Sequence, residues 1–204
     1  MGLLMLNETT AFKLAVWKIE EQASFFEDAI AYAPQSVHPG RRLQQLATRF
    51  LLKQLNHDFP IDTIVINESG KPFLPGQELQ FNLTHTTDLA AAIISDLKAV
   101  GIDAEKIDQR VLKIEHKFLN SEERKSLTSL TEIEKISRLT LYWTIKEAVY
   151  KWWGRGAIDF ANDILIEPSN LTLENTTVRF AQTGEILNVS SVQLDQHWIT
   201  YLVK

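Results

Sequence analysis

A long helix is predicted from about Glu132 to Trp153, and this element limits the possible folds more than any other. It ends at Gly154-Arg155-Gly156, because glycine commonly follows the last helical residue. A second helix is predicted from Arg41 to Asn56, where apolar residues recur at the spacing of one helical face. Those residues are Leu43, Leu46, Ala47, Phe50, Leu51 and Leu55.

Short apolar runs bounded by turn residues predict β-strands in most of the remaining chain. An acidic helix is predicted from Glu20 to Ala33, and another helix start at Asn120, where Glu123 lies at the spacing of a capping box. The predicted strands cover residues 12–19, 61–66, 81–83, 89–95, 99–104, 178–180, 186–189, 192–194 and 198–203. Helices and antiparallel strands in this order indicate the α+β class.

Composition excludes several classes of protein. The chain of 204 residues has no cysteine, so disulfides, thiolate catalysis and sulfur-ligated zinc are excluded. With 21 Lys+Arg against 26 Asp+Glu, the net charge of -5 argues against a nucleic-acid partner. The chain lacks an apolar run of about twenty residues, so we expect no membrane partner and a cytoplasmic location.

The segment Gly101-Ile102-Asp103-Ala104-Glu105 is the first candidate for chemistry. Side chains alternate along a strand, so Asp103 and Glu105 point the same way, roughly 7 Å apart, and can share one hard cation. Taken alone, an acidic pair of this kind is more often a solvated strand edge or a turn.

The second candidate is the face of the long helix that carries Trp143, Glu147 and Lys151 at i, i+4 and i+8. An ordinary surface Glu–Lys pair has the same spacing, but the aromatic-rich surroundings favour a functional site. Asp103, Glu105 and Glu147 together form an oxygen-donor set of the kind that Mg²⁺ uses.

These two segments resemble the core motifs of the Sfp-type 4′-phosphopantetheinyl transferases. The family pattern is Gly-Ile-Asp-x-Glu, then Trp-[Ser/Thr]-x-Lys-Glu-[Ser/Ala]-x-x-Lys and Gly-x-Gly, and this chain has GIDAE (101–105) and WTIKEAVYKWWGRG (143–156). Three further segments resemble family motifs, namely Gly70-Lys71-Pro72, FNLTHT (81–86) and KFLNSEE (117–123). Threonines replace both serines of Ser-His-Ser, and Ala104 replaces the usual Ile or Val, but no functional group is lost.

The resemblance implies a pseudo-dimer of two similar α+β lobes. Each lobe would have a small, three-stranded antiparallel sheet and a long helix, with coenzyme A bound between them. We expect an N-terminal lobe over residues 1–98 and a C-terminal lobe, carrying the metal site, over residues 99–204. A chain that contains both lobes is expected to act as a monomer.

The resemblance also implies an activity. The enzyme would transfer 4′-phosphopantetheine from coenzyme A to a serine of an apo acyl or peptidyl carrier protein and release 3′,5′-ADP. It would depend on Mg²⁺, and oxygen ligands accept Mn²⁺ as well. The alternatives are an inactive homologue that binds coenzyme A or a carrier, and a magnesium-dependent phosphoesterase. The carrier and its pathway stay open.

Roles for individual residues follow from the resemblance. Asp103, Glu105 and Glu147 carry over as metal ligands, and Glu147, Lys151 and Glu105 as catalytic residues. Either glutamate, or a metal-bound water that it orients, would take the serine proton, and the family parallel favours Glu147. Lys151 would stabilise the leaving diphosphate.

Coenzyme A would contact several further residues. The resemblance assigns Lys71, Pro72, Thr84, His85 and Lys151 to this group, although His85 could instead be an interior histidine. Arg41, Arg42 and Arg49 are candidates for the 3′-phosphate and adenine, because guanidinium groups match phosphate geometry, although a basic helix face is usually only solvated.

The carrier protein would need a local patch with positive charge and apolar area. Segments 111–113 and 116–119 supply both types of residue. The remaining histidines show no ligand spacing and are interpreted as structural or surface residues, namely His38, His57, His116 and His197.

Overall fold

The computed structural model describes residues 2–34, 36–167 and 175–204 of the chain. Its helices are α1 (Ala23–Ile30), α2 (Pro39–Leu55), α3 (Glu115–Phe118), α4 (Ser121–Lys125) and α5 (Glu132–Trp153), with 3₁₀ turns η1 (Ile61–Thr63) and η2 (Gln109–Lys113). Its strands are β1 (Leu3–Glu8), β2 (Lys13–Lys18), β3 (Val65–Ile66), β4 (Pro72–Phe73), β5 (Gln80–His85), β6 (Leu89–Ser95), β7 (Val100–Lys106), β8 (Ile164–Ile166), β9 (Thr176–Phe180), β10 (Glu185–Leu194) and β11 (His197–Val203). None of the described helices is both long and apolar enough to cross a membrane.

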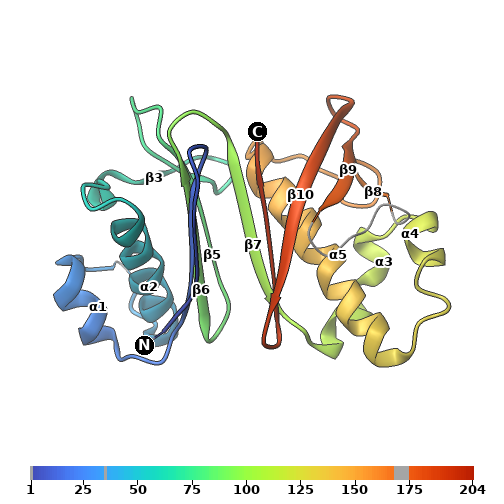
Figure 1. Ribbon diagram of the computed structural model, residues 1–204, viewed down its shortest axis with the longest axis horizontal. Coiled ribbons are helices and arrows are strands. Elements are labelled where there is room, and N and C mark those ends of the chain that lie inside the picture. The colour runs from blue at the N-terminus through green and yellow to red at the C-terminus, as the bar shows by residue number, and fades with distance from the viewer. Residues whose placement is uncertain (1, 35, 168–174) are drawn as a thin grey trace.

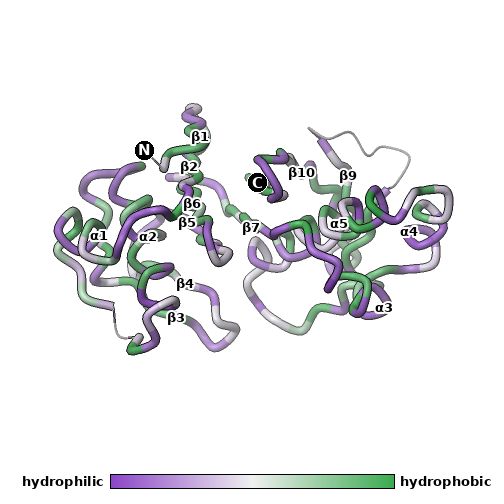
Figure 2. Tube along the Cα trace, turned by 90° about the horizontal axis from the view of Figure 1, so that it is seen from below, coloured by the Kyte–Doolittle hydropathy of each residue, from purple (hydrophilic) through white to green (hydrophobic). Residues whose placement is uncertain are grey.

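The elements form four layers, with two sheets in the middle and helices outside them (Figures 1 and 2). The first sheet has the order β1-β2-β6-β5 and is covered by α1 and α2. The second has the order β7-β11-β10-β9-β8 and is covered by α5, with α3 and α4 beyond it. Both sheets are antiparallel, so the predicted α+β class is confirmed.

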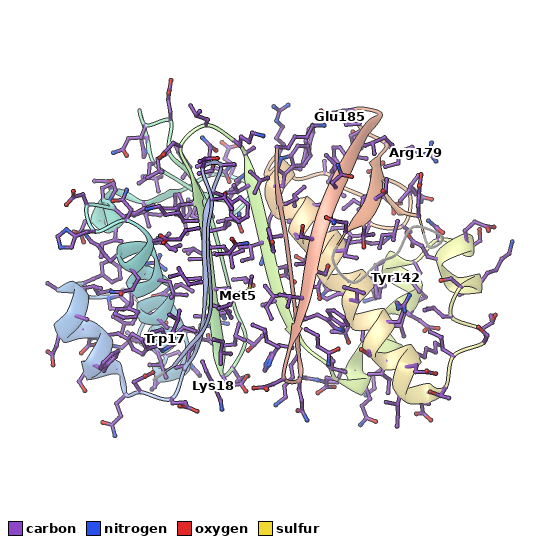
Figure 3. The ribbon with its side chains drawn as sticks, viewed as in Figure 1. Met5, Trp17, Lys18, Tyr142, Arg179 and Glu185 are labelled. Carbon is purple, nitrogen blue, oxygen red and sulfur yellow. The ribbon has the colours of Figure 1, made fainter. Side chains whose placement is uncertain are left out.

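The faces of the two sheets that point toward each other form a shared apolar core. Leu14, Val16 and Ile93 of the first sheet cluster with Ile102 and Ile199 of the second, and all five residues are fully buried. Side-chain alternation sends neighbouring residues to the opposite face, against α1 and α2. In Figure 3, Met5 and Trp17 therefore lie on opposite sides of the first sheet.

The packing of α5 on β7 depends on a glycine. A Cβ atom at Gly101 would lie 2.2 Å from the carbonyl oxygen of Ala148 and 2.8 Å from the backbone nitrogen of Trp152. Only glycine therefore permits this close approach of helix and strand. Alternation then places Asp103 and Glu105 on the same face as Gly101, toward α5.

A buried ion pair holds α5 from its other side. Lys146 and Glu123 are both fully buried, and Lys146 Nζ lies 2.8 Å from Glu123 Oε2. The ammonium also donates to the carbonyl oxygens of Phe160 and Ile164, at 2.8 and 2.7 Å. Glu123 Oε1 accepts from the backbone amide of Ile166 at 3.0 Å. The pair thus fixes α4, α5 and the start of β8 together, and removal of one partner would leave a buried charge uncompensated.

Both long helices agree with the sequence prediction, and several strands differ from it. Strand β1 was not predicted, the run 61–66 is a 3₁₀ turn followed by a two-residue strand, and residues 186–194 belong to one strand instead of two. The helix predicted for 20–33 ends at Ile30, because Ala31 has a left-handed backbone with φ 50°.

The expectation of three-stranded sheets is wrong. The first sheet has four strands because β1 adds to its edge, and the second has five because β8 and β9 extend it beyond β10. The predicted boundary at residues 98 and 99 falls in the short connection between β6 and β7.

Candidate active site

The acidic residues of β7 and the charged residues of α5 meet where the two elements pack. Lys151 Nζ lies 2.6 Å from Asp103 Oδ1, and the Asp103 side chain is almost completely buried. Trp143 Nε1 donates to Glu105 Oε1 at 3.1 Å, so Trp143 orients that carboxylate. Glu147 lies one helical turn from both Trp143 and Lys151, on the same face of α5.

Asp103 is also held from the first sheet. Thr84 Oγ1 donates to Asp103 Oδ1 at 3.0 Å and accepts from the backbone amide of Ala104 at 3.2 Å. The resemblance assigned Thr84 to coenzyme A, whereas in the structure its buried hydroxyl faces Asp103. Thr84 therefore orients a carboxylate of the site.

The three carboxylates repel one another in a partly buried setting. Burial and the negative charges of Asp103 and Glu105 raise the pKa of Glu147 to about 7, against the opposing effect of Lys151. Burial and Asp103 also raise the pKa of Glu105, which the Trp143 hydrogen bond partly counters. A cation near these groups would relieve the repulsion.

The three carboxylates have some, but not all, features of a divalent metal site. Within the described parts of the chain, no three acidic or histidine side chains lie close enough together to hold a metal ion. Asp103 Oδ2, however, is buried without a hydrogen-bond partner among the described residues, which is costly for a carboxylate oxygen. Asp103, Glu105 and Glu147 offer only oxygen donors, so the set fits a hard cation such as Mg²⁺.

Three basic side chains from different elements, Arg49 of α2, His85 of β5 and Lys151 of α5, influence one another electrostatically beside Asp103. Burial lowers the pKa of His85 at the end of β5, and Lys151 and Arg49 lower it further, while Asp103 raises it. The neutral imidazole is therefore favoured at pH 7. Arg49 and Lys151 thus both disfavour a positive charge on His85.

Lys71 and Pro72 line a pocket of about 190 Å³ together with Asn82, Tyr150 and Lys151. Burial lowers the pKa of Lys71, and its Nζ donates to the carbonyl oxygen of Trp152 at 2.9 Å. Two lysines that are far apart in the sequence, Lys71 and Lys151, therefore line the same pocket.

The three arginines of α2 have different surroundings. Arg41 is exposed, and Arg42 donates to Glu27, with Nε 2.9 Å from Oε1. Arg49 lies over the ring of Tyr32, and its buried Nε has no hydrogen-bond partner among the described residues. Arg49 thus differs from Arg42 in that no carboxylate among the described residues pairs with it.

Sequence reasoning missed contacts that join distant segments. His197, interpreted as structural or surface, lies with its Nε2 3.1 Å from Asp88 Oδ1 and 3.4 Å from Thr86 Oγ1. It thereby anchors the turn that follows His85. The partners are 109 and 111 residues apart, and no local pattern signals such a pairing.

The fold and the site together define an α+β protein with three carboxylates and a lysine gathered where α5 packs on β7. A family model described as the 4′-phosphopantetheinyl transferase superfamily matches residues 99–202. The 4′-phosphopantetheinyl transferase AcpT of Salmonella typhimurium (strain LT2) is 33% identical over 147 residues, or 71% of this chain and 74% of that protein. AcpT of Escherichia coli (strain K12) is 30% identical over 162 residues, or 75% and 82%.

The 4′-phosphopantetheinyl transferase gsp of Aneurinibacillus migulanus is 34% identical over 113 residues, which are 54% of this chain. The match spans about half of that relative, 46% of its length. The chain belongs to the 4′-phosphopantetheinyl transferase superfamily, a superfamily of enzymes.

The elevated pKa of Glu147 predicts how stability depends on pH in the metal-free protein. The Glu147 carboxyl group has a pKa of about 7 in the folded protein and 4.5 in the unfolded chain. Its contribution to the stability of the folded state is therefore fully present below pH 4.5 and is lost as the pH rises through 7. In EDTA, the free energy of unfolding of the wild type should therefore fall between pH 5 and pH 8, by on the order of 2–3 kcal/mol at about 1.4 kcal/mol per pKa unit.

Urea unfolding of Glu147→Gln at the two pH values checks this, since the variant should lack that part of the fall. Glu122→Gln is the matched control, because Glu122 is exposed and pairs with Lys125 at the surface. A Glu147→Gln protein whose stability follows the wild-type pH dependence would contradict the assignment.

Proposed function

We propose that this enzyme transfers 4′-phosphopantetheine from coenzyme A to a serine of an apo acyl or peptidyl carrier protein, with Mg²⁺ as its cofactor. The observation that carries the proposal is the convergence of Asp103, Glu105, Glu147 and Lys151 where α5 packs on β7. Membership of the superfamily supports it. This is the activity of a holo-carrier-protein synthase.

In the proposed reaction, the serine hydroxyl oxygen attacks the β-phosphorus of coenzyme A and forms a new phosphodiester bond. The bond from that phosphorus to the bridging oxygen breaks, and 3′,5′-ADP leaves with the electron pair. The serine proton passes to a base, for which we propose Glu147. Glu147 supplies a carboxylate one helical turn from Lys151, on the same face of α5.

The other residues of the site would handle the negative charge of the diphosphate. Asp103, Glu105 and Glu147 would hold the Mg²⁺, or Mn²⁺ in its place. When bound, the cation would neutralise charge on the pyrophosphate. Lys151 would stabilise the leaving diphosphate, while Thr84 and Trp143 keep Asp103 and Glu105 oriented.

We assign coenzyme A to the side of the site where basic residues of the N-terminal and C-terminal parts of the chain lie. Lys71, Pro72 and Lys151 line the pocket between the halves. Arg49 and His85 would bind phosphate oxygens, and the neutral His85 would act as a hydrogen-bond donor. Arg42 is less suited to the 3′-phosphate than Arg49, because it already pairs with Glu27.

We place the carrier protein beside Trp143. Two hollows flank this residue, one of about 310 Å³ that also includes Glu105 and Ile114, and one of about 580 Å³ that also includes Lys117 and Phe160. Lys113 and Lys117 are exposed nearby and offer positive charge to an acidic carrier. Phe118 and Leu119, which the sequence suggested as apolar contacts, are buried, so apolar contact falls to the residues around Trp143.

Intact-protein mass spectrometry tests the proposed activity. An apo acyl carrier protein incubated with the enzyme, coenzyme A and Mg²⁺ should gain one phosphopantetheine. The gain should disappear with EDTA and with Glu147→Ala, and persist with Glu122→Ala, a change of the same type at an exposed site.

Two other outcomes would replace the proposal. Binding of coenzyme A without transfer to several acyl and peptidyl carriers would indicate the inactive homologue. Hydrolysis of a generic phosphodiester above the level of Glu147→Ala would indicate a phosphoesterase.

Charge reversal tests the carrier surface. Lys113→Glu and Lys117→Glu should each raise the KM for the carrier, and together by roughly tenfold, because long-range attraction to an acidic partner is lost. The turnover number should change less than twofold. Steady-state kinetics with Lys98→Glu, an exposed lysine in the β6–β7 connection, provides the control. An unchanged KM in the double variant would exclude this surface.

A further inference from the structure

The turn between β3 and β4, residues 67–71, is rigidly built. Asn67 Oδ1 accepts from the backbone amide of Lys71 at 2.8 Å, and the backbone amide of Asn67 donates to the carbonyl oxygen of Lys71 at 3.0 Å. The Gly70 amide donates to the Asn67 carbonyl at 3.0 Å, and Gly70 has the positive φ of 84° that favours glycine. The turn therefore presents Ser69 and Lys71 in fixed directions.

Three side chains of this turn reach the end of α5. Ser69 Oγ donates to the carbonyl oxygen of Gly154 at 2.6 Å, and Asn67 Nδ2 lies 3.3 Å from the same oxygen. Lys71 Nζ donates to the carbonyl oxygen of Trp152 at 2.9 Å. The last carbonyl groups of a helix lack partners within the helix and carry partial negative charge, so these donors satisfy them.

The contact leaves no space for a side chain at residue 154. A Cβ atom there would lie 2.2 Å from Lys71 Cδ, and Gly154 has a φ of 63°. The shape of the helix end and the shape of the turn are thus matched across two segments that lie 85 residues apart.

The clasp, as we name Asn67, Ser69, Lys71 and Gly154, forms one wall of the pocket between the halves. Ser69, Lys71 and Gly154 line that pocket, and so does Lys151, three residues before Gly154. The separation of the two ammonium groups therefore depends on how the turn is attached to α5.

We propose that Ser69 is a positioning residue for substrate binding. Its hydrogen bond to Gly154 fixes Lys71 relative to Lys151 across the pocket, so that both ammonium groups meet one anionic ligand. That this ligand is coenzyme A rests on the function proposed above. Glu147 is held separately by the packing of α5 on β7, so loss of the clasp should weaken binding and spare chemistry.

Calorimetric binding and kinetics with Ser69→Ala test the proposal. The Kd for coenzyme A should rise roughly two- to tenfold, the range expected for the loss of one neutral hydrogen bond. The turnover number at saturating coenzyme A should stay within twofold, and Ser69→Thr should restore binding because it restores the hydroxyl. Thr63→Ala is the matched control, since Thr63 is exposed and its hydroxyl donates to the Pro60 carbonyl within its own turn.

Hydrogen exchange separates this proposal from the proposed function. Without any ligand, the amides of residues 67–71 should exchange faster in Ser69→Ala than in the wild type, and unchanged exchange would show that the clasp does not hold. An unaltered Kd, or a fall in turnover as large as the rise in Kd, would also overturn the proposal. If the wild type fails to bind coenzyme A, the proposed function is refuted. The hydrogen-exchange result would still show whether the Ser69 hydrogen bond holds the turn to α5.

Discussion

The close contact between α5 and β7 is the constraint on which the site depends. Gly101 lets the helix backbone approach to a distance that excludes any side chain at that position. At that distance, Glu147 and Lys151 face Asp103 and Glu105 instead of solvent, so four charges share a partly buried space. As a result, Lys151 is paired with Asp103, one oxygen of Asp103 has no hydrogen-bond partner among the described residues, and the pKa of Glu147 is raised to about 7.

The rest of the fold holds that contact in place from both sides. The apolar core between the sheets supports β7 through Ile102 and Ala104. The buried pair of Lys146 and Glu123 anchors α5 on the side away from β7. Two consecutive residues of α5 thus point in different directions. Lys146 fixes the helix in the protein, and Glu147 faces the site.

Sequence reasoning succeeded where the information is local. The periodicity of α2 and α5 and the alternation in β7 predicted which carboxylates share a face, and the structure pairs Asp103 with Lys151. It failed at β1, where the apolar run was not recognised as a strand and only its pairing with β2 defines it. Contacts such as Thr84 with Asp103 and Ser69 with Gly154 join residues 19 and 85 positions apart, so only the three-dimensional arrangement reveals them.

In the proposed enzyme, Asp103, Glu105 and Glu147 would form one cation site next to the bound substrate. Titration with Mn²⁺ followed by electron paramagnetic resonance can detect this site, because oxygen ligands that hold Mg²⁺ also accept Mn²⁺. In the presence of coenzyme A, our account predicts one bound Mn²⁺ per chain, lost in Asp103→Asn and retained in Asp96→Asn, which alters an exposed carboxylate. Equal binding of Mn²⁺ by the wild type and Asp103→Asn, or no binding by either, would contradict it.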